Sequence, residues 1–172
     1  MEFSRLIETR ASTKSYSDEM PAAEKIDAVI AAGLRAPSGR NLQAPIIVAV
    51  TDKKVRDRLS AANAAIMGAS ADPFYNAPAV IVVLAKKTAR TYVYDGSLAM
   101  GQMMLAAHNE GLGSCWIHRA REVFSLPEWQ EWLRSIGIED EVEGVGNLVL
   151  GYPKEDIPEP KAVAPGRVYY VK

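Results

Sequence analysis

Apolar and polar residues alternate along this chain in blocks that match helices and short buried strands. Ile26, Val29, Ile30 and Leu34 recur at three- and four-residue spacing, as expected for a helix with one buried face. Residues 80–84, in contrast, form a continuous apolar run of strand length. The pattern predicts helices over residues 2–9, 21–36, 53–67 and 93–110 and one that opens at Pro127, and strands over residues 46–50, 80–84, 114–117, 145–150 and 167–171.

The segment 93–110 differs from the other predicted helices because its residues are apolar or small almost all round. A helix of that kind is expected to be buried on every side. In a chain of 172 residues such cover needs a second subunit, so we expect two copies to associate. Residues 152–166 hold four of the ten prolines and are predicted to form an extended arm.

Composition narrows the class of protein without identifying it. A length of 172 residues fits one domain, and we expect residues 1–172 to form it, with residues 152–172 as an arm. The net charge of −1 argues against a nucleic acid or a membrane surface as partner. We also expect a cytoplasmic location, because Cys115 has no second cysteine to pair with and neither a signal pattern nor a membrane-length apolar run occurs.

A basic segment near the start of the chain carries the first candidate chemistry. In an extended strand Arg10, Ser12 and Lys14 point to one side, and two cations with a hydroxyl suit a phosphate. Lys161 and Arg167 in the predicted arm are candidates to complete that site. Taken alone, an alternating basic run is more typical of a solvated loop than of a binding site.

A second polar segment lies between a predicted helix and a predicted strand. Its Ser, Asn and Gln side chains offer neutral donors and acceptors that suit the edge of a heterocycle, and its glycine permits close approach of the backbone. A plain turn would have the same composition. The candidate residues here are Pro37, Ser38, Gly39, Asn41 and Gln43.

A third segment follows the apolar helix. Gly111 and Gly113 are expected to end that helix through a left-handed cap. The next strand then emerges where backbone N–H groups are able to face a ligand. The candidates are Trp116, Ile117, His118 and Arg119, for which core packing of the tryptophan is the simpler interpretation.

Several other kinds of site are not indicated. No glycine-rich phosphate loop follows a predicted strand, which excludes the dinucleotide and P-loop motifs. His108 and His118 lie ten residues apart without neighbouring cysteines or clustered carboxylates, so no metal site is expected. Cys115 has no histidine partner in the sequence pattern and is predicted to be a small buried residue.

Four motifs in order resemble the nitroreductase family of FMN-dependent oxidoreductases. They are Arg-x-Ser-x-Lys, Ala-Pro-Ser-x-x-Asn-x-Gln, Gly-Leu-Gly-Ser-Cys-Trp and Leu-Gly-Tyr-Pro, and together they span nearly the whole chain. The resemblance implies an α+β fold with a central, mostly antiparallel sheet flanked by helices. It also implies a homodimer with two FMN sites lined by both subunits, and a C-terminal arm or strand that reaches the partner.

The resemblance also implies roles for the candidate residues. Arg10 and Ser12 would hold the FMN phosphate and ribityl chain, completed by Lys161 and Arg167, and Lys14 would stabilise negative charge at the pyrimidine edge. The loop at 37–43 would come from the other subunit. Near the flavin N5 the lining residues would be Trp116, Ile117, His118 and Arg119. The substrate contacts would be Phe74, Tyr75 and His118, and Phe74 and Tyr75 are equally consistent with residues that only anchor their loop.

The resemblance implies transfer of a hydride from NADH or NADPH, through FMN N5, to an electron-poor acceptor of nitroaromatic or quinone type. The implied mechanism is ping-pong and needs no acid–base pair of side chains. His118 and Arg119 stand where many relatives carry small residues. If they point at the ring, they would narrow the pocket and add positive charge, which would favour an anionic acceptor; the alternative is that they only contact a phosphate. The alternatives are a specialised flavoprotein of the family with another substrate, an FMN-binding module without turnover, and a dimeric structural domain without cofactor.

Overall fold

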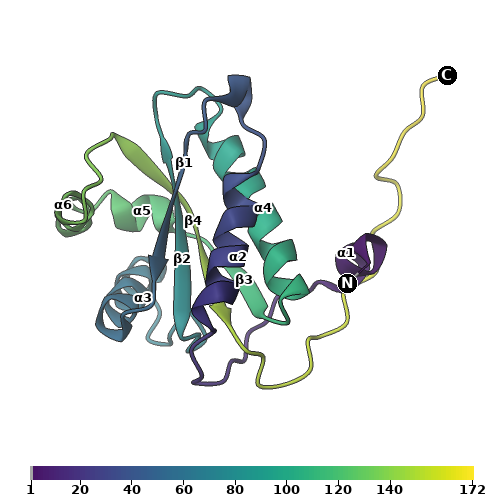
Figure 1. Cartoon of the computed structure of the whole chain (residues 1–172), viewed down its shortest axis with the longest axis horizontal. Coiled ribbons are helices and arrows are strands. Elements are labelled where there is room, and N and C mark those ends of the chain that lie inside the picture. Colours follow the sequence, from purple (N-terminus) through teal and green to yellow (C-terminus); the bar gives the residue numbers. More distant parts are fainter. Residues whose placement is uncertain (1) are drawn as a thin grey trace.

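The computed structural model describes residues 2–172, and their centre is a four-stranded sheet. The strands are β1 (Pro45–Val50), β2 (Ala79–Lys86), β3 (Gly113–Ile117) and β4 (Val142–Gly151). Their order across the sheet is β1-β2-β4-β3, and every neighbouring pair is antiparallel (Figure 1). The antiparallel sheet with helices of an α+β fold is therefore confirmed.

Helices cover both faces of this sheet, as Figure 1 shows. On one face lie α2 (Ala23–Leu34) and α4 (Tyr92–Asn109), and on the other lie α3 (Lys53–Met67), α5 (Ala120–Phe124) and α6 (Pro127–Ser135). The two faces of β2 consequently belong to two separate apolar clusters, because successive side chains of a strand point in opposite directions. This double cover explains why residues 80–84 form a continuous apolar run.

Two further helices lie outside these layers. The short helix α1 (Phe3–Thr9) packs against the end of α4, and one turn of 3₁₀ helix, η1 (Gly39–Asn41), precedes β1. Helix α5 was not predicted from the sequence, because it spans five residues and has no apolar period of its own. The predicted helices and the first four predicted strands are all present, with boundaries shifted by a few residues.

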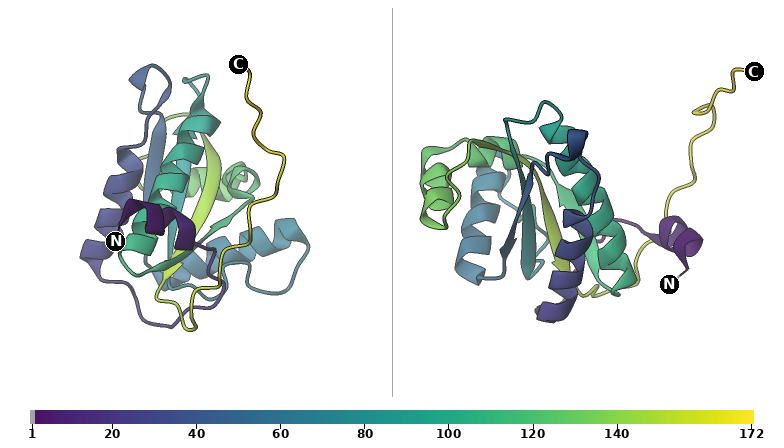
Figure 2. Two further views of the ribbon diagram at one scale, coloured as in Figure 1. Left: turned by 90° about the vertical axis from the view of Figure 1, so that its right-hand side faces the viewer. Right: turned by 45° about the horizontal axis from the view of Figure 1, so that its top comes forward.

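The C-terminal segment departs from the prediction. Residues 167–171 form no strand in the structure, and residues 158–172 are exposed throughout. A strand needs a neighbour for its backbone N–H and C=O groups, and no sheet edge of the same chain lies beside this segment. Figure 2 shows the arm running past α1 and away from the body of the molecule.

Helix α4 is also less buried than its sequence suggested. Ala99, Met100 and Met103 are fully buried against the sheet. On its outer face, however, Tyr94 is 72% and Leu98 is 49% exposed. None of the described residues covers this outer face, so its burial by a second subunit stays a prediction.

Candidate functional site

The segment from Arg10 to Lys14 runs extended along β3. The backbone N–H of Thr13 donates a hydrogen bond to the carbonyl of Ser114 at 3.0 Å, and Ser12 forms a parallel bridge with Ser114. Thr13 is buried, whereas Ser12 and Lys14 are exposed and Arg10 is half-buried. The alternation predicted for this segment is therefore present, and pairing with β3 fixes it.

Two cavities meet at Lys14. The first, the Lys14 cavity, has a volume of about 380 Å³ and lies between the end of β3 and the loop that follows α3. The second, the arm-side cavity, has a volume of about 340 Å³ and lies between the basic segment and the start of the arm. The Lys14 cavity is lined by Lys14, Met67, Ala71, Asp72, Pro73, Tyr75, Cys115, Trp116, Ile117, His118 and Arg119, and the arm-side cavity by Ser12, Thr13, Lys14, Ser15, Glu155, Asp156 and Pro158.

The two aromatic residues expected over the site take different positions. The ring of Tyr75 lines the Lys14 cavity, with its centroid 5.7 Å from Nζ of Lys14. Phe74 is fully buried in the core, where its ring lies 5.6 Å from the Arg56 guanidinium. Neighbouring residues in this turn point in opposite directions, so Phe74 presents no surface to the cavity. This corrects the expectation that both rings cover it.

Asp72 holds the loop that carries Tyr75. Its carboxylate accepts hydrogen bonds from the Ser60 hydroxyl, from Arg56 at 2.5 Å and from the backbone N–H groups of Phe74 and Asn76 at 2.9 and 2.8 Å. Burial raises the pKa of Asp72, but these four donors outweigh burial and lower it below its usual value. The carboxylate is therefore ionised and saturated with donors.

A buried amide holds the turn at the end of β3. The side-chain Nδ2 of Asn63 donates to the carbonyl of His118 at 2.8 Å, and its Oδ1 accepts from Nε of Arg119 at 3.1 Å. Arg119 has a left-handed backbone with φ of 73°, which is uncommon for a residue with a side chain. The fully buried Asn63 thus fixes both the turn and the side chain that follows it.

The thiol of Cys115 remains protonated at neutral pH. Burial raises the pKa of Cys115, and the hydrogen bond from Ser12 and the positive charges of Lys14 and Arg10 offset this only in part. A protonated, buried thiol is a poor nucleophile, so Cys115 serves as a packing residue in the cavity wall, in keeping with its sequence context.

The polar loop at 37–43 lies at the other end of α4. The N–H of Gly39 donates to Oδ1 of Asp95 in the first turn of α4 at 3.0 Å, whereas Thr9 contacts His108 in its last turn at 2.9 Å. Helix α4 has 18 residues, so these two ends are roughly 27 Å apart. A single chain does not bring this loop to the cavities beside Lys14.

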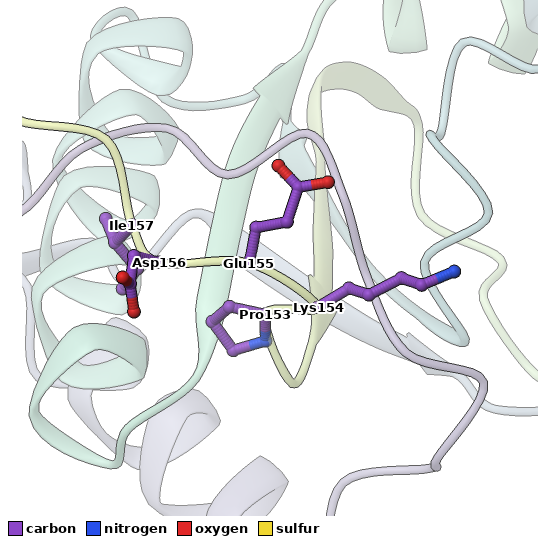
Figure 3. A pocket seen from close by; sticks show the side chains of 5 residues that line it. All are labelled: Pro153, Lys154, Glu155, Asp156 and Ile157. Atoms are coloured by element: carbon purple, nitrogen blue, oxygen red, sulfur yellow. The ribbon is translucent and has the colours of Figure 1, made fainter.

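The basic residues of the arm also lie apart from the segment that begins at Arg10. Among the described residues, no hydrogen bond or ion pair involves Lys161 or Arg167, and both side chains are exposed. At the root of the arm lies another hollow of about 660 Å³, lined by residues 153–157. Figure 3 shows the side chains of Lys154, Glu155 and Asp156 there pointing in different directions, so they do not converge on a common point.

Three residues that shape these features were not found by sequence reasoning. Asn63 and Asp72 hold the walls of the Lys14 cavity, and Asp95 anchors the loop at 37–43. One signal was available in the sequence: Asn63 stands on the apolar stripe of α3, and a buried amide needs polar partners. Asp72 and Asp95 look like ordinary turn and helix-start residues until their partners are known.

Comparison with known proteins decides the family. The family model described as Nitroreductase family matches residues 7–136. A protein of Archaeoglobus fulgidus, named as an NADH dehydrogenase/NAD(P)H nitroreductase, is 32% identical over 158 residues, which cover 88% of this chain and 86% of the relative. The chain belongs to the nitroreductase family.

Solved structures that share the architecture of this nitroreductase-family chain include proteins with bound FMN. A nitroreductase with bound FMN from Bacteroides fragilis is similar over 100% of both chains, with a TM-score of 0.88 and 26% identity. An iodotyrosine deiodinase bound to FMN and 3-iodo-L-tyrosine is similar over 98% of this chain and 97% of its own, with a TM-score of 0.70 and 23% identity, and so shares the fold.

The described part of this family member contains neither a membrane-spanning helix nor a cluster of metal-ligating side chains. Within residues 2–172, no helix combines the length and the apolar character that crossing a bilayer requires. Over the same residues, no three histidine, cysteine, aspartate or glutamate side chains gather in a way that could hold a metal ion.

Proposed function

We propose that this protein binds FMN and uses it to transfer a hydride from NADH or NADPH to a small electron-poor acceptor, of nitroaromatic or quinone type. The observation that carries the proposal is the position of Lys14 at the junction of two cavities, on the same extended segment as Arg10 and Ser12. The relatives named for nitroreductase activity and for bound FMN support it.

The donors present fit the phosphate and the ring of FMN. No carboxylate of the described residues forms an ion pair with Arg10 or Lys14, so both cations are available to an anion. Glu155 and Asp156 line the arm-side cavity and oppose an anion there. Ser12 lines that cavity too, so the positive charge has to come from Arg10, which lies two residues earlier and lines neither cavity. We assign the phosphate to the Arg10 guanidinium together with the Ser12 hydroxyl, and the negative edge of the ring to Lys14.

The other lining residues would orient the ring and exclude water. Tyr75 and the end of β3 face the same cavity as Lys14, with residues 116–119 forming one wall. When bound, FMN supplies the hydride-carrying chemistry, and the protein supplies position and electrostatics. Lys14 would stabilise negative charge on the cofactor, and the ring of Tyr75 and the end of β3 would shield that charge from part of the solvent. No acid–base pair of side chains is needed for this role.

The separation of the two polar segments supports a homodimer. Ser38, Asn41 and Gln43 lie at one end of α4 and the Arg10 segment at the other. Two copies that pack through the exposed apolar face of α4 would bring the loop of one beside the cavities of the other. The arm, with Lys161 and Arg167, would then cross to the partner and supply the remaining phosphate contacts.

The test is the visible absorption of the purified protein, followed by addition of NADH or NADPH without oxygen. We expect the bands of oxidised flavin, or their appearance when FMN is added, and bleaching by at least one nicotinamide. Size measurement by light scattering on the same sample should give twice the mass of the chain.

Each contrary outcome points to a named alternative. A yellow protein that neither nicotinamide bleaches would indicate a specialised family member with another electron donor, or a binding module without turnover. A folded protein that remains colourless in excess FMN would contradict the proposal and leave a structural domain with the fold alone.

A further inference from the structure

Two contacts hold the side chain of Arg119 in the wall of the Lys14 cavity. Its Nε donates to Oδ1 of Asn63 at 3.1 Å, and Nη2 lies 2.9 Å from Sδ of Met67, which lines the same cavity. A long charged side chain normally loses rotamer freedom only at a cost. Here the fully buried amide of Asn63 has already fixed the guanidinium.

This guanidinium has no anionic partner in the chain. Among the described residues, Arg119 forms no ion pair with a carboxylate. An arginine carries five donors and a permanent charge, of which Asn63 and Met67 use one each. The remaining donors are therefore available to a ligand in the cavity.

The acidic residue in the cavity wall does not cancel this charge. Both oxygens of Asp72 are saturated by Arg56, Ser60 and two backbone N–H groups, and the carboxylate is paired with the buried Arg56. Lys14 and Arg119 thus leave the cavity with unpaired positive charge. Its other walls include Met67, Pro73 and the ring of Tyr75, which suit a flat aromatic body.

From this geometry we infer that the space beside the bound flavin ring in this cavity selects acceptors in which a carboxylate is attached to the electron-poor aromatic ring, and that Arg119 binds that carboxylate. Arg119 is then a substrate-binding residue, and Asn63 positions it. The inference rests on the proposed function for its reaction, but the binding step is independent of turnover. A guanidinium and a carboxylate form short, charge-assisted hydrogen bonds, which a neutral analogue does not reproduce.

The experiment compares 4-nitrobenzoate with 4-nitrobenzamide, which share the nitro group and the ring and differ in charge. Three variants are made: Arg119→Gln removes the charge, Arg119→Lys keeps it, and Arg121→Gln is the matched control. Arg121 is two residues away and exposed, and it does not line the Lys14 cavity. The ratio of kcat/KM for the two acceptors within one variant cancels any general loss of activity.

We expect Arg119→Gln to lower this ratio by about tenfold or more, mainly through a higher KM for 4-nitrobenzoate. Arg119→Lys should retain most of the ratio, and Arg121→Gln should match the wild type. An unchanged ratio in Arg119→Gln overturns the inference, as does an equal fall in Arg121→Gln. A change confined to the preference for NADPH over NADH also overturns it, because the anion bound would then be the 2′-phosphate of the donor.

Calorimetry with benzoate and benzamide, which cannot be reduced, provides the second measurement. Wild-type protein should bind benzoate more tightly than benzamide, and Arg119→Gln should lose that difference. If neither nicotinamide bleaches the protein, the proposed function fails while this titration still decides the inference. If turnover is normal and both ligands bind equally to the wild type, the inference fails and the proposed function stands.

Discussion

The backbone N–H of Gly39 donates a hydrogen bond to Oδ1 of Asp95 at 3.0 Å, and this contact ties the loop at 37–43 to the first turn of α4. Asp95 is only 3% exposed, and its second oxygen accepts a hydrogen bond from the hydroxyl of Thr91. A side chain at position 39 would overlap that hydroxyl, so glycine is required there. The loop that we assign to the partner's cofactor site is thus anchored by a buried carboxylate.

Replacing Asp95 by alanine should lower the free energy of unfolding by about 1–3 kcal/mol, because two partly buried donors, the Gly39 N–H and the Thr91 hydroxyl, lose their acceptor. Hydrogen exchange of the amides in residues 38–43 should also accelerate. Asp27→Ala removes the same charge from an exposed position on α2 and serves as the control. Equal urea midpoints for the two variants would show that Asp95 does not anchor the loop.

Arg10→Ala should weaken FMN binding by about 1.5–3 kcal/mol, the scale of a hydrogen bond to a charged group. Riboflavin, which lacks the phosphate, should bind the variant and the wild type alike. Both affinities follow from quenching of flavin fluorescence on titration with apoprotein. Arg5→Ala in the exposed part of α1 is the matched control. If Arg10→Ala weakened riboflavin binding as much as FMN binding, Arg10 would not act through the phosphate.

Lys14→Met should slow reduction of the bound flavin by about 10- to 100-fold and lower its midpoint potential, because the variant loses the cation next to the site of negative charge. Stopped-flow absorbance without oxygen measures the rate, and a dye-linked titration measures the potential. Lys54→Met removes an exposed lysine at the start of α3 and should change neither quantity. Normal kinetics in Lys14→Met would reject this role.

The buried phenol of Tyr16 predicts a loss of stability at alkaline pH. Its hydroxyl donates to the carbonyl of Thr13 at 2.7 Å, and burial, followed by the nearby Cys115 and Tyr75, raises its pKa well above the usual 10. Below pH 10 the Tyr16 phenol keeps its proton in both the folded and the unfolded chain. Above it the unfolded chain loses the proton first, so the free energy of unfolding falls by up to about 1.4 kcal/mol per pH unit from this group.

Urea unfolding between pH 8 and 11 tests this for wild type, Tyr16→Phe and Tyr169→Phe. The stability advantage of the wild type over Tyr16→Phe should shrink as the pH rises above 10. Tyr169 is 86% exposed, so the comparison with Tyr169→Phe should stay flat. A constant difference between wild type and Tyr16→Phe across this range would mean that the phenol titrates normally in the folded state.

Much of the fold could be predicted from local pattern. The apolar period of α2, the continuous run in β2 and the proline that opens α6 each reflect forces within a few residues, so their elements are present as predicted. Helix α5 and the strand predicted at 167–171 depended on tertiary context. The first begins from a left-handed turn held by another helix, and the second lacks a neighbouring strand.

The candidate site also has features that the local sequence predicts and features that depend on tertiary contacts. The sequence by itself determined the alternation along Arg10, Ser12 and Lys14 and the order of the family motifs, because strand geometry and chain order are local properties. Only the tertiary structure decided that Asn63 supports Arg119 from 56 positions away, that Phe74 points into the core and that Asp95 anchors Gly39. Contacts of that kind arise from packing of whole helices against the sheet, and local residue patterns do not specify which polar groups that packing brings together.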